Sequence, residues 1–461
     1  MLARLGQRIA AVFRASAPDP FVIAVLLTAL TLGLVVAFTD VGPVEAIEAW
    51  GADDGLWAFL GFSMQMCLIL VTGHALAASR PVAALLRRLA DLPRTGAQAA
   101  FLVALVAAAL GVVNWGLGLI GGAILARDTG RSLVRRSVCA HYPLLAASGY
   151  VGLMVWHGGL SGTAPLKVTT ARELADSLGP VAPLVEPMPL TQTVLSPMNL
   201  IVTGGLVLLA PTVMALLTPK RPDDAEPADR FLTPAPGGEA ERVEAGPAPI
   251  VPRILEETPI VSLLLVIMIA VWAWRFYLPG ADAPSGITRL TPNSVNLTML
   301  MLGLALHGTP RRYLAAVDEA VRGCAGIILQ FPLYAGIMAM LNGSGLTARF
   351  AEALASGATE TTLPVLTFLS AGAVNLFIPS GGGQWAVQGP IAVRAALDAG
   401  VEPAKIVMAV AYGDQLTNML QPFWALPLLA VTGVRARDIV GYTALLMVLA
   451  GAWVALWLLV F

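Results

Sequence analysis

The stretch AVNLFIPSGGGQWAVQGP, Ala373–Pro390, interrupts an apolar region with residues that do not continue a helix. Pro379 lacks a backbone N–H, and three glycines, Gly381–Gly383, follow Ser380 directly. Non-helical backbone at membrane depth is tolerated only where it is buried in protein or lines a cavity. The stretch therefore predicts the tip of a re-entrant hairpin, with a half-helix beginning at the glycines. Close packing of helices on small residues is the alternative explanation.

The rest of the chain has the composition of a membrane protein. Of its 461 residues, 57% are hydrophobic and 12% are charged, with a mean hydropathy of +0.76. A soluble domain carries about 25% charged residues. Many apolar runs approach the length of about 20 residues that crosses a bilayer as a helix. We expect an all-α polytopic membrane protein with about 9–11 membrane-crossing helices, and the net charge of −1 does not indicate a nucleic-acid partner.

A charged, proline-rich segment divides the chain. Residues 219–257 contain eight prolines and too little apolar surface to fold alone, so they predict a mobile cytoplasmic linker. The first transmembrane half then covers residues 1–218 and the second covers residues 258–461.

The placement of arginines orients the segments by the positive-inside rule. Arginine-rich loops flank residues 97–126 on both sides, so both ends of this stretch are expected in the cytoplasm. A single crossing helix cannot return to its starting side, which predicts a re-entrant hairpin with its tip near Asn114–Gly118; two short crossings are the alternative. Three arginines within the first 14 residues predict an amphipathic N-terminal segment on the cytoplasmic surface. The C-terminus is expected outside.

The order of these features recurs in the second half. A hairpin at 97–126 precedes an interrupted helix at 143–166, and a hairpin at 361–399 precedes an interrupted helix at 404–433. Polar landmarks are 49 and 43 residues apart in the first half and 45 and 39 apart in the second: Gln65, Asn114 and His157; Gln330, Asn375 and Asp414. Loop charges give the two units opposite orientations. We therefore expect two inverted repeats, the architecture of secondary transporters.

The second hairpin tip has the chemistry of a carboxylate site. Backbone N–H groups at a glycine-rich helix start carry partial positive charge and suit an anion. Candidate substrate-binding residues are the polar and glycine residues at both tips and in the first interrupted helix: Asn114, Gly116, Gly118, Ser161, Thr163, Asn375, Ser380, Gly381, Gly382, Gly383 and Gln384. Helix packing is the alternative for Gly116 and Gly118, and bonding to a helix carbonyl is the alternative for Ser161 and Thr163. Four tryptophans near the breaks either wall a pocket or belong to the core: Trp115, Trp156, Trp385 and Trp424.

Asp414 is the most informative single residue, because no other charge lies between Lys405 and Arg435. An intramembrane acid is costly and marks a functional site by default. It can carry a proton, bind Na⁺ together with Asn418, or take a structural hydrogen bond. His157, at the equivalent break, can shuttle protons or be a hydrogen-bonded lining residue. These three are the candidate cation-coupling residues; a Na⁺ site would lie near Asn114, Asn375 and Asp414, and no other cofactor is expected.

These motifs resemble the bacterial short-chain fatty acid transporter family, which brings acetoacetate, butyrate and similar acids into the cell. The resemblance runs over nearly the whole chain, through GFSMQMCLILVTGHALA, VVNWGLGLIGGA, QFPLYAGIM, NLFIPSGGGQWAVQGP and AYGDQLTNMLQPFWALP. It implies a superfamily fold of inverted repeats with two opposed hairpins and elevator-like movement. It also implies that Asn114 and Asn375 correspond to tip positions that hold cations and substrate.

The chain departs from the family pattern at the positions that matter for coupling. The Ser-Asn-Thr tip signature of dicarboxylate relatives is replaced by Val-Asn-Trp and Val-Asn-Leu, so Na⁺ coupling does not carry over. Position 414 is more familiar in the family as Glu, and position 157 as Gly.

We therefore expect a secondary active transporter of short-chain monocarboxylates in the bacterial cytoplasmic membrane, driven by H⁺ or Na⁺. A homodimer is expected by analogy with elevator carriers. The alternatives are a Na⁺-coupled dicarboxylate or other organic anion carrier and, in another class, an intramembrane hydrolase using Ser161 or Ser380 with His157. The hydrolase requires a nucleophile and a base within hydrogen-bond reach, and no catalytic motif in the sequence supports it.

Overall fold

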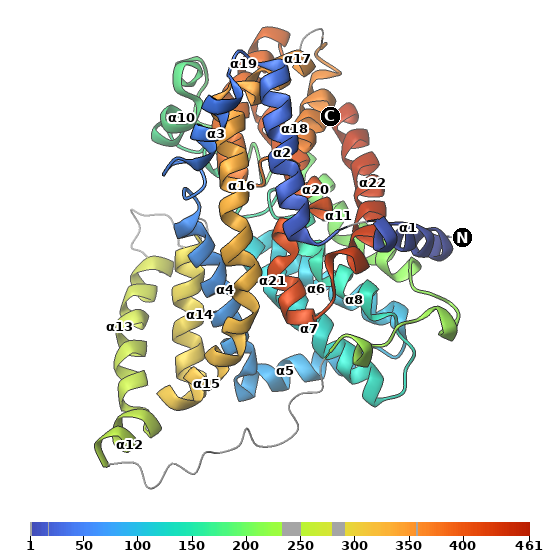
Figure 1. The fold of residues 1–461 in the computed structure, drawn as a ribbon, viewed down its shortest axis with the longest axis vertical. Helices are drawn as coiled ribbons and strands as arrows, with labels where there is room; N and C mark the ends of the chain where they lie inside the picture. The colour runs from blue at the N-terminus through green and yellow to red at the C-terminus, as the bar shows by residue number, and fades with distance from the viewer. Residues whose placement is uncertain (1, 17, 233–249, 279–290, 356–357) are drawn as a thin grey trace.

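The computed structural model describes residues 2–16, 18–232, 250–278, 291–355 and 358–461 (Figure 1). Within these ranges every regular element is a helix. The protein is therefore all-α, as expected.

The helices of the first half are interrupted where the sequence predicts breaks. In chain order they are α1 (Leu2–Ser16), α2 (Pro20–Phe38), α3 (Pro43–Gly51), α4 (Leu60–Ala78), α5 (Arg80–Asp91), α6 (Gly96–Val113), α7 (Trp115–Arg135), α8 (Tyr142–Tyr150), the 3₁₀ helix η1 (Val151–Met154), α9 (Thr163–Leu166), α10 (Ala171–Leu178), η2 (Gly179–Leu184) and α11 (Pro197–Leu216). Two short 3₁₀ helices follow, η3 (Pro222–Asp224) and η4 (Ala228–Arg230).

The second half shows a similar order of elements. It comprises α12 (Ile250–Glu257), α13 (Ile260–Tyr277), α14 (Pro292–His307), α15 (Pro310–Val321), η6 (Arg322–Cys324), α16 (Ala325–Gly343), α17 (Leu346–Ala355), α18 (Leu363–Asn375), α19 (Gly381–Ala399), α20 (Pro403–Thr417), η7 (Asn418–Leu420), α21 (Pro422–Thr432) and α22 (Ala436–Val460).

Seven helical segments of the described ranges are long and apolar enough to cross a membrane: Pro20–Phe38, Leu60–Ala78, Gly96–Val113, Pro197–Leu216, Ile250–Tyr277, Pro310–Gly343 and Ala436–Val460. Shorter apolar helices, such as α18 and α21, account for part of the higher number expected from the sequence. On α13, Leu264 and Met268 are 65% and 63% exposed. Apolar surface of this extent is typical of contact with lipid.

Local chemistry explains both hairpin breaks. Asn114 adopts extended backbone (φ −158°, ψ 133°), and its Oδ1 accepts the N–H groups of Gly116 and Leu117 at the start of α7. In the second half, Ser380 is extended (φ −151°, ψ 106°) after Pro379, and its Oγ accepts the Gly383 N–H. Each hairpin therefore turns at a capping residue, which leaves a helix N-terminus at the tip.

The two halves pack on each other in a reciprocal way. Helix α2 packs on α16 of the second half, and α14 packs on α4 of the first. Likewise α3 contacts α16 and α15 contacts α4, and α11 packs against α22. The inverted symmetry, the re-entry of the hairpins and their sidedness stay predictions.

The first part of the expected linker contacts neighbouring helices. Tyr142 N–H donates to the Glu226 carbonyl, and Glu226 N–H donates to His141 Nδ1. Ala228 is 2% exposed. Arg14 pairs with the Glu226 carboxylate at 2.7 Å, so this segment is held against α1 and α8. Residues 233–249, also assigned to the linker, lie outside the described residues.

The N-terminal segment is helical, and it packs on protein. In Figure 1, α1 lies beside the lower part of α22. A Cβ on Gly441 of α22 would stand 2.4 Å from the Ala10 Cα, so the two backbones are in close contact. Arg14 also reaches Asp438 of α22, at 2.9 Å. Helix α1 is thus anchored to the C-terminal helix.

Candidate functional site

A central cavity of about 280 Å³ lies where both interrupted helices and the second hairpin tip meet. Phe62 and Gln65 of α4 form one side. The remaining lining residues come from α7, η1, the following turn, α9, the α19 start and α21: Trp115, Leu153, Trp156, Thr163, Ser380, Gly381, Gly382 and Trp424. Cavities of this kind, apolar with a few convergent polar groups, are the usual form of small-ligand sites.

Hydrogen-bond donors at the start of α19 form the polar end of the cavity. The backbone N–H of Gly383 is occupied by the Ser380 hydroxyl at 3.1 Å. Among the hydrogen bonds of the described residues, none uses the N–H of Gly381 or Gly382. The Thr163 side chain lies opposite, since its Oγ1 would be 3.3 Å from a Cβ placed on Gly381. The free N–H groups at a helix N-terminus favour an anion.

Aromatic rings form the apolar wall. The rings of Trp115 and Trp424 meet edge to face with centroids 5.3 Å apart, and Phe62 meets Trp424 at 6.0 Å. Trp156 also lines the cavity. Trp385, in contrast, is 1% exposed within a separate core cluster and does not line the cavity. Three of the four tryptophans thus surround the cavity, and the fourth is a core residue.

His157 lies directly behind the hairpin tip and is fully buried. A Cβ on Gly381 would stand 3.2 Å from its Cε1 atom. His157 Nε2 accepts the backbone N–H of Ala164 at 2.9 Å, and the ring stacks on that of Trp156 with centroids 4.3 Å apart. The imidazole is therefore held in place between the cavity wall and α20.

Asp414 faces the other nitrogen of that ring. Its Oδ1 lies 3.2 Å from His157 Nδ1, and the two side chains are 2% and 1% exposed. The contact lacks the geometry of a regular hydrogen bond, and Asp414 Oδ2 is buried without a partner. The structure thus brings together two of the candidate cation-coupling residues, which are 257 positions apart in the sequence.

The Asn375 amide organises the backbone beside this pair. Its Nδ2 lies 2.6 Å from the Asp414 carbonyl oxygen, 3.0 Å from Thr417 Oγ1 and 3.0 Å from Asn418 Oδ1. These are the oxygens that a Na⁺ ion at this point would use, because hard cations take oxygen ligands. Here they face an N–H₂ group. In this arrangement the residues do not fit a Na⁺ site, although the chemistry of the donor set is otherwise suitable.

The Asn114 tip is a capping structure. Asn114 is 2% exposed, and its side-chain oxygen is used by the α7 cap. Ser161 Oγ accepts the Trp115 N–H at 3.2 Å, and a Cβ on Gly116 would meet the Asn114 Oδ1 at 3.2 Å. Of these residues only Trp115 lines the cavity. This tip supports the cavity wall from behind.

Gly118 and Gln384, both expected to bind substrate, do not line this cavity. A Cβ on Gly118 would stand 2.6 Å from the Gly111 Cα, so Gly118 permits close helix packing. The Gln384 amide donates to the Ala371 carbonyl and to Gln388 Oε1, both at 2.9 Å, and is completely buried. Gln384 therefore ties α19 to α18.

Sequence reasoning missed Gln415, which contacts the first interrupted helix. Its Oε1 accepts the N–H groups of His157 and Gly158 at 2.9 and 3.0 Å. Its neighbour Asp414 can be recognised in the sequence because no other charge lies near it. A glutamine in a polar stretch has no such distinguishing feature. Phe62 and Leu153 were also missed, because apolar residues that line a cavity look like any other core residues.

The geometry does not form the hydrolase site considered above. Both nitrogens of His157 face other groups, Ala164 N–H and Asp414. Ser161 Oγ is bonded to Trp115 N–H and Ser380 Oγ to Gly383 N–H. No serine–histidine hydrogen bond is formed by these two candidates.

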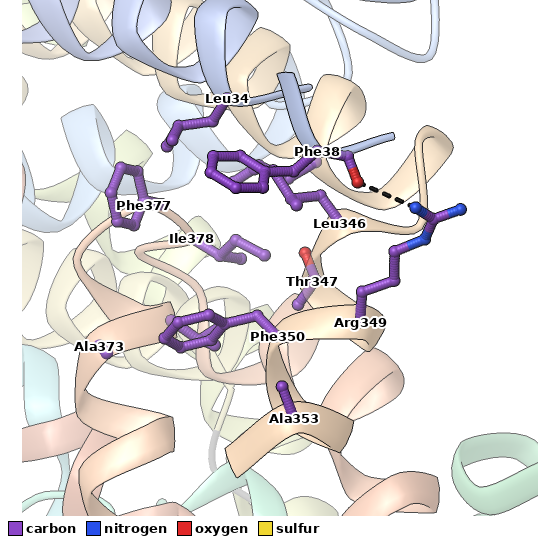
Figure 2. A pocket seen from close by; sticks show the side chains of 12 residues that line it. Leu34, Phe38, Leu346, Thr347, Arg349, Phe350, Ala353, Ala373, Phe377 and Ile378 are labelled. Carbon is purple, nitrogen blue, oxygen red and sulfur yellow. Dashed lines mark hydrogen bonds between the residues drawn. The ribbon is translucent and has the colours of Figure 1, made fainter. Parts of the chain in front are cut away.

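A second cavity, of about 550 Å³, lies on the other side of the hairpin tip. Figure 2 shows Phe38, Phe350, Phe377 and Ile378 around it. Arg349 at its edge already donates to the Phe38 carbonyl at 2.9 Å and to the Asp40 carboxylate at 2.8 Å. Because Thr347 is the other polar residue of an otherwise apolar lining, this cavity is less suited to a small carboxylate than the central one.

The fold is that of a multi-pass helical membrane protein, with a cavity among the ends of interrupted helices. The chain belongs to the family described as Short chain fatty acid transporter, which it matches over residues 1–461. It is accordingly a multi-pass protein of the bacterial inner membrane.

Two curated relatives support this membership. An Escherichia coli K12 protein is 40% identical over 432 residues, 93% of each chain, and one from Haemophilus influenzae is 35% identical over 449 residues, 96% of each. Both carry the provisional name short-chain fatty acid transporter.

Among solved structures, the chain is similar to the YdaH transporter of Alcanivorax borkumensis (TM-score 0.43, 18% identity, 96% of this chain and 97% of that one). It is also similar to MtrF of Neisseria gonorrhoeae, from a class of antimetabolite efflux pumps (TM-score 0.40, 17% identity, 98% and 97%).

Proposed function

We propose that this protein is a secondary active carrier of short-chain monocarboxylates, of the size of butyrate or acetoacetate, driven by a coupled cation. The observation that carries the proposal is the division of the central cavity into a polar end and an aromatic wall. Free N–H groups of Gly381 and Gly382 form the polar end, and the rings of Trp115, Trp156 and Trp424 form the aromatic wall.

The polar end suits one carboxylate. Substrate oxygens would accept the two free N–H groups, with the hydroxyls of Ser380 and Thr163 beside them. No lysine or arginine is among the residues that line this cavity. A second carboxylate would find no charged partner there, which favours monocarboxylates over dicarboxylates.

The size of the cavity suits a short tail. A volume of about 280 Å³ is just below the usual range for ligand pockets, about 300–1,000 Å³. The tail of a four-carbon acid would lie against the aromatic wall, where apolar burial contributes about 0.8 kcal/mol per CH₂. Long-chain acids would not be enclosed.

Movement of the second hairpin against α4 is the proposed route of alternating access. The cavity lies between Phe62 and Gln65 of α4 on one side and the start of α19 on the other. Displacement of α19 together with α20 and α21 relative to α4 would open it without unfolding a helix. The elevator movement and the expected homodimer are parts of this proposal.

Exchange in proteoliposomes tests the proposal. Purified protein should exchange external labelled butyrate for internal butyrate or acetoacetate, and excess succinate or a long-chain acid should not compete. Protein-free liposomes measure passive entry of the acid. Equal competition by succinate would refute the assignment to monocarboxylates.

A matched pair of threonine variants locates the site. Thr163→Val removes a hydroxyl at the cavity and should weaken butyrate binding by about tenfold, the effect of one hydrogen bond to a charged group, about 1.5 kcal/mol. Thr28→Val on α2 removes a hydroxyl that bonds only within its own helix, to Ala24, and should leave binding unchanged. Equal effects would show that the cavity is not the binding site.

A further inference from the structure

We propose that the second cavity, beside the hairpin tip, holds one acyl chain of a membrane phospholipid whose head group carries an ammonium, as in phosphatidylethanolamine. Arg349 and Asp40, at the mouth of the cavity, bind the phosphate and the ammonium of that head group. This lipid site is independent of the carrier function proposed above.

The lining of the cavity selects an apolar occupant. Thr347 and Arg349 are its polar residues, and the others are aliphatic or aromatic. Thr347 is 4% exposed, and its hydroxyl is bonded to Asn342 Oδ1 at 3.4 Å. A buried water needs about two to four polar partners, which this lining does not supply. A space of about 550 Å³ therefore suits a hydrocarbon chain better than water, because protein interiors leave few large voids unfilled.

The mouth of the cavity lies at the depth of the lipid head groups. Helix α2 is long and apolar enough to cross the membrane, and no charged residue lies between Asp19 and Asp40. The end of α2 at Phe38 therefore marks the boundary between hydrocarbon and water. Phe38 and Phe350, which line the cavity (Figure 2), are 62% and 42% exposed, as expected for side chains that contact lipid.

Arg349 is available to a phosphate at this mouth. Its side chain is 55% exposed and pairs with Asp40, whose side chain is 95% exposed, at 2.8 Å. An exposed ion pair contributes little free energy, so a ligand can share both groups. Arg349 donates through its two terminal nitrogens, to the Phe38 carbonyl and to Asp40 Oδ2. No hydrogen bond of the described residues uses its Nε–H, and guanidinium N–H groups bind phosphate oxygens well.

Asp40 selects the charge of the rest of the head group. Its Oδ2 faces Arg349, and among the described residues its Oδ1 has no hydrogen-bond donor. This carboxylate attracts an ammonium and repels a head group with a net negative charge, such as phosphatidylglycerol. Phosphatidylcholine offers a positive charge without N–H donors. The two charges together therefore match phosphatidylethanolamine.

The position of the cavity gives the bound chain a mechanical effect. Leu34 and Phe38 of α2 lie on one side, and Val374 of α18 and Ile378 of the following turn lie on the other. Ile378 precedes the first residue of α19, Gly381, by three positions. A chain in the cavity packs against α2 and the hairpin at the same time. It should therefore stabilise the hairpin tip in the position described here.

Lipid binding to purified, delipidated protein in detergent tests the proposal. Phosphatidylethanolamine, phosphatidylcholine and phosphatidylglycerol with identical acyl chains are compared by native mass spectrometry and by thermal unfolding. The wild type should retain one phosphatidylethanolamine and unfold at a higher temperature when this lipid is added. Phosphatidylcholine should bind about fivefold more weakly, the upper effect of one exposed ion pair, and phosphatidylglycerol more weakly still.

A matched pair of alanine variants locates the acyl chain. Ala373→Phe adds a ring at the hairpin side of the cavity and should abolish both lipid retention and the rise in unfolding temperature. Ala270→Phe makes the same change at an exposed position of α13, a helix that packs on α12 and α14. This control should behave like the wild type.

Two exposed variants test the head group. Asp40→Asn should bind phosphatidylethanolamine and phosphatidylcholine equally, because the partner of the ammonium is lost. Arg349→Gln should weaken binding of both lipids, because both contain the phosphate. These two variants decide the question if Ala373→Phe does not fold.

Three results would overturn the proposal. Equal lipid retention by the wild type and Ala373→Phe would show that the acyl chain lies elsewhere. Tighter binding of phosphatidylglycerol than of phosphatidylethanolamine would contradict the assigned head group, as would a preference for phosphatidylethanolamine that persists in Asp40→Asn. Butyrate is absent from these measurements, so their failure would leave the proposed carrier function untouched.

Discussion

The substitution Gly381→Ala, which adds a single methyl group at the start of α19, tests the location of the substrate site. In Gly381→Ala the new Cβ would stand 2.9 Å from Trp156 Cη2, 3.2 Å from His157 Cε1 and 3.3 Å from Thr163 Oγ1. Two of these atoms belong to buried aromatic rings that stack on each other. The rings cannot yield like the end of a flexible side chain, so the wall of the cavity must shift.

The next residue provides a matched control. In Gly382→Ala the nearest atom to the new Cβ is Thr163 Cγ2, at 3.8 Å, an ordinary contact. Both substitutions replace glycine with alanine in the first turn of the same helix. Any gain in helix propensity, up to about 1 kcal/mol, is therefore shared and cancels in the comparison.

The cost of the extra methyl group gives the expected loss of butyrate affinity in Gly381→Ala relative to Gly382→Ala. Overpacking a filled site by a methyl group costs about 1–3 kcal/mol, which corresponds to a loss of affinity of about 5- to 150-fold if the strain falls on the substrate-bound state. We expect butyrate affinity to fall within this range in Gly381→Ala and by less than about threefold in Gly382→Ala.

Equilibrium binding of labelled butyrate, together with thermal unfolding of each variant, measures this difference. Unfolding temperatures separate a binding defect from a folding defect. Equal affinities of the two variants would refute the assignment of the carboxylate to this face of α19. A Gly381→Ala protein that unfolds at a lower temperature but binds normally would refute it as well.

Three further predictions concern stability, each measured by thermal unfolding. A Cβ in Gly122→Ala would stand 2.1 Å from the carbonyl oxygen of Gly149, so it should destabilise the protein by about 3 kcal/mol, whereas Gly204→Ala, with nothing within 4 Å, should not. Gln415→Leu leaves two buried backbone N–H groups without an acceptor and should cost about 1–3 kcal/mol for each; an unchanged unfolding temperature would contradict this. Burial lowers the pKa of His141, in the loop before α8, to about 4. The pKa of this histidine in the unfolded chain is about 6.5. The neutral His141 side chain should therefore contribute fully to the free energy of unfolding above about pH 6.5, and this contribution should disappear as the pH falls toward about 4. The variant His141→Phe should lose this pH dependence of stability.

Much of the local structure could be predicted from the sequence because it depends on neighbours in the chain. Pro379 and the following glycines end one helix, and Ser380 caps the next. Asn114 breaks the first hairpin by capping α7 with its own side chain. Continuous apolar runs of about 20 residues are sufficient to predict an all-helical membrane protein, because only a helix of that length satisfies its backbone groups within one segment.

The sequence left the roles of individual polar residues and glycines open, and the tertiary structure decided them. Gly118 and Gly381 look alike in the sequence, yet one packs against a neighbouring backbone and the other lines the cavity. Gln384 turns inward to bind α18. The Asp414–His157 contact joins residues 257 positions apart. Whether a buried polar group binds a ligand or another part of the protein depends on which helix faces it, and only the packing of distant helices determines that.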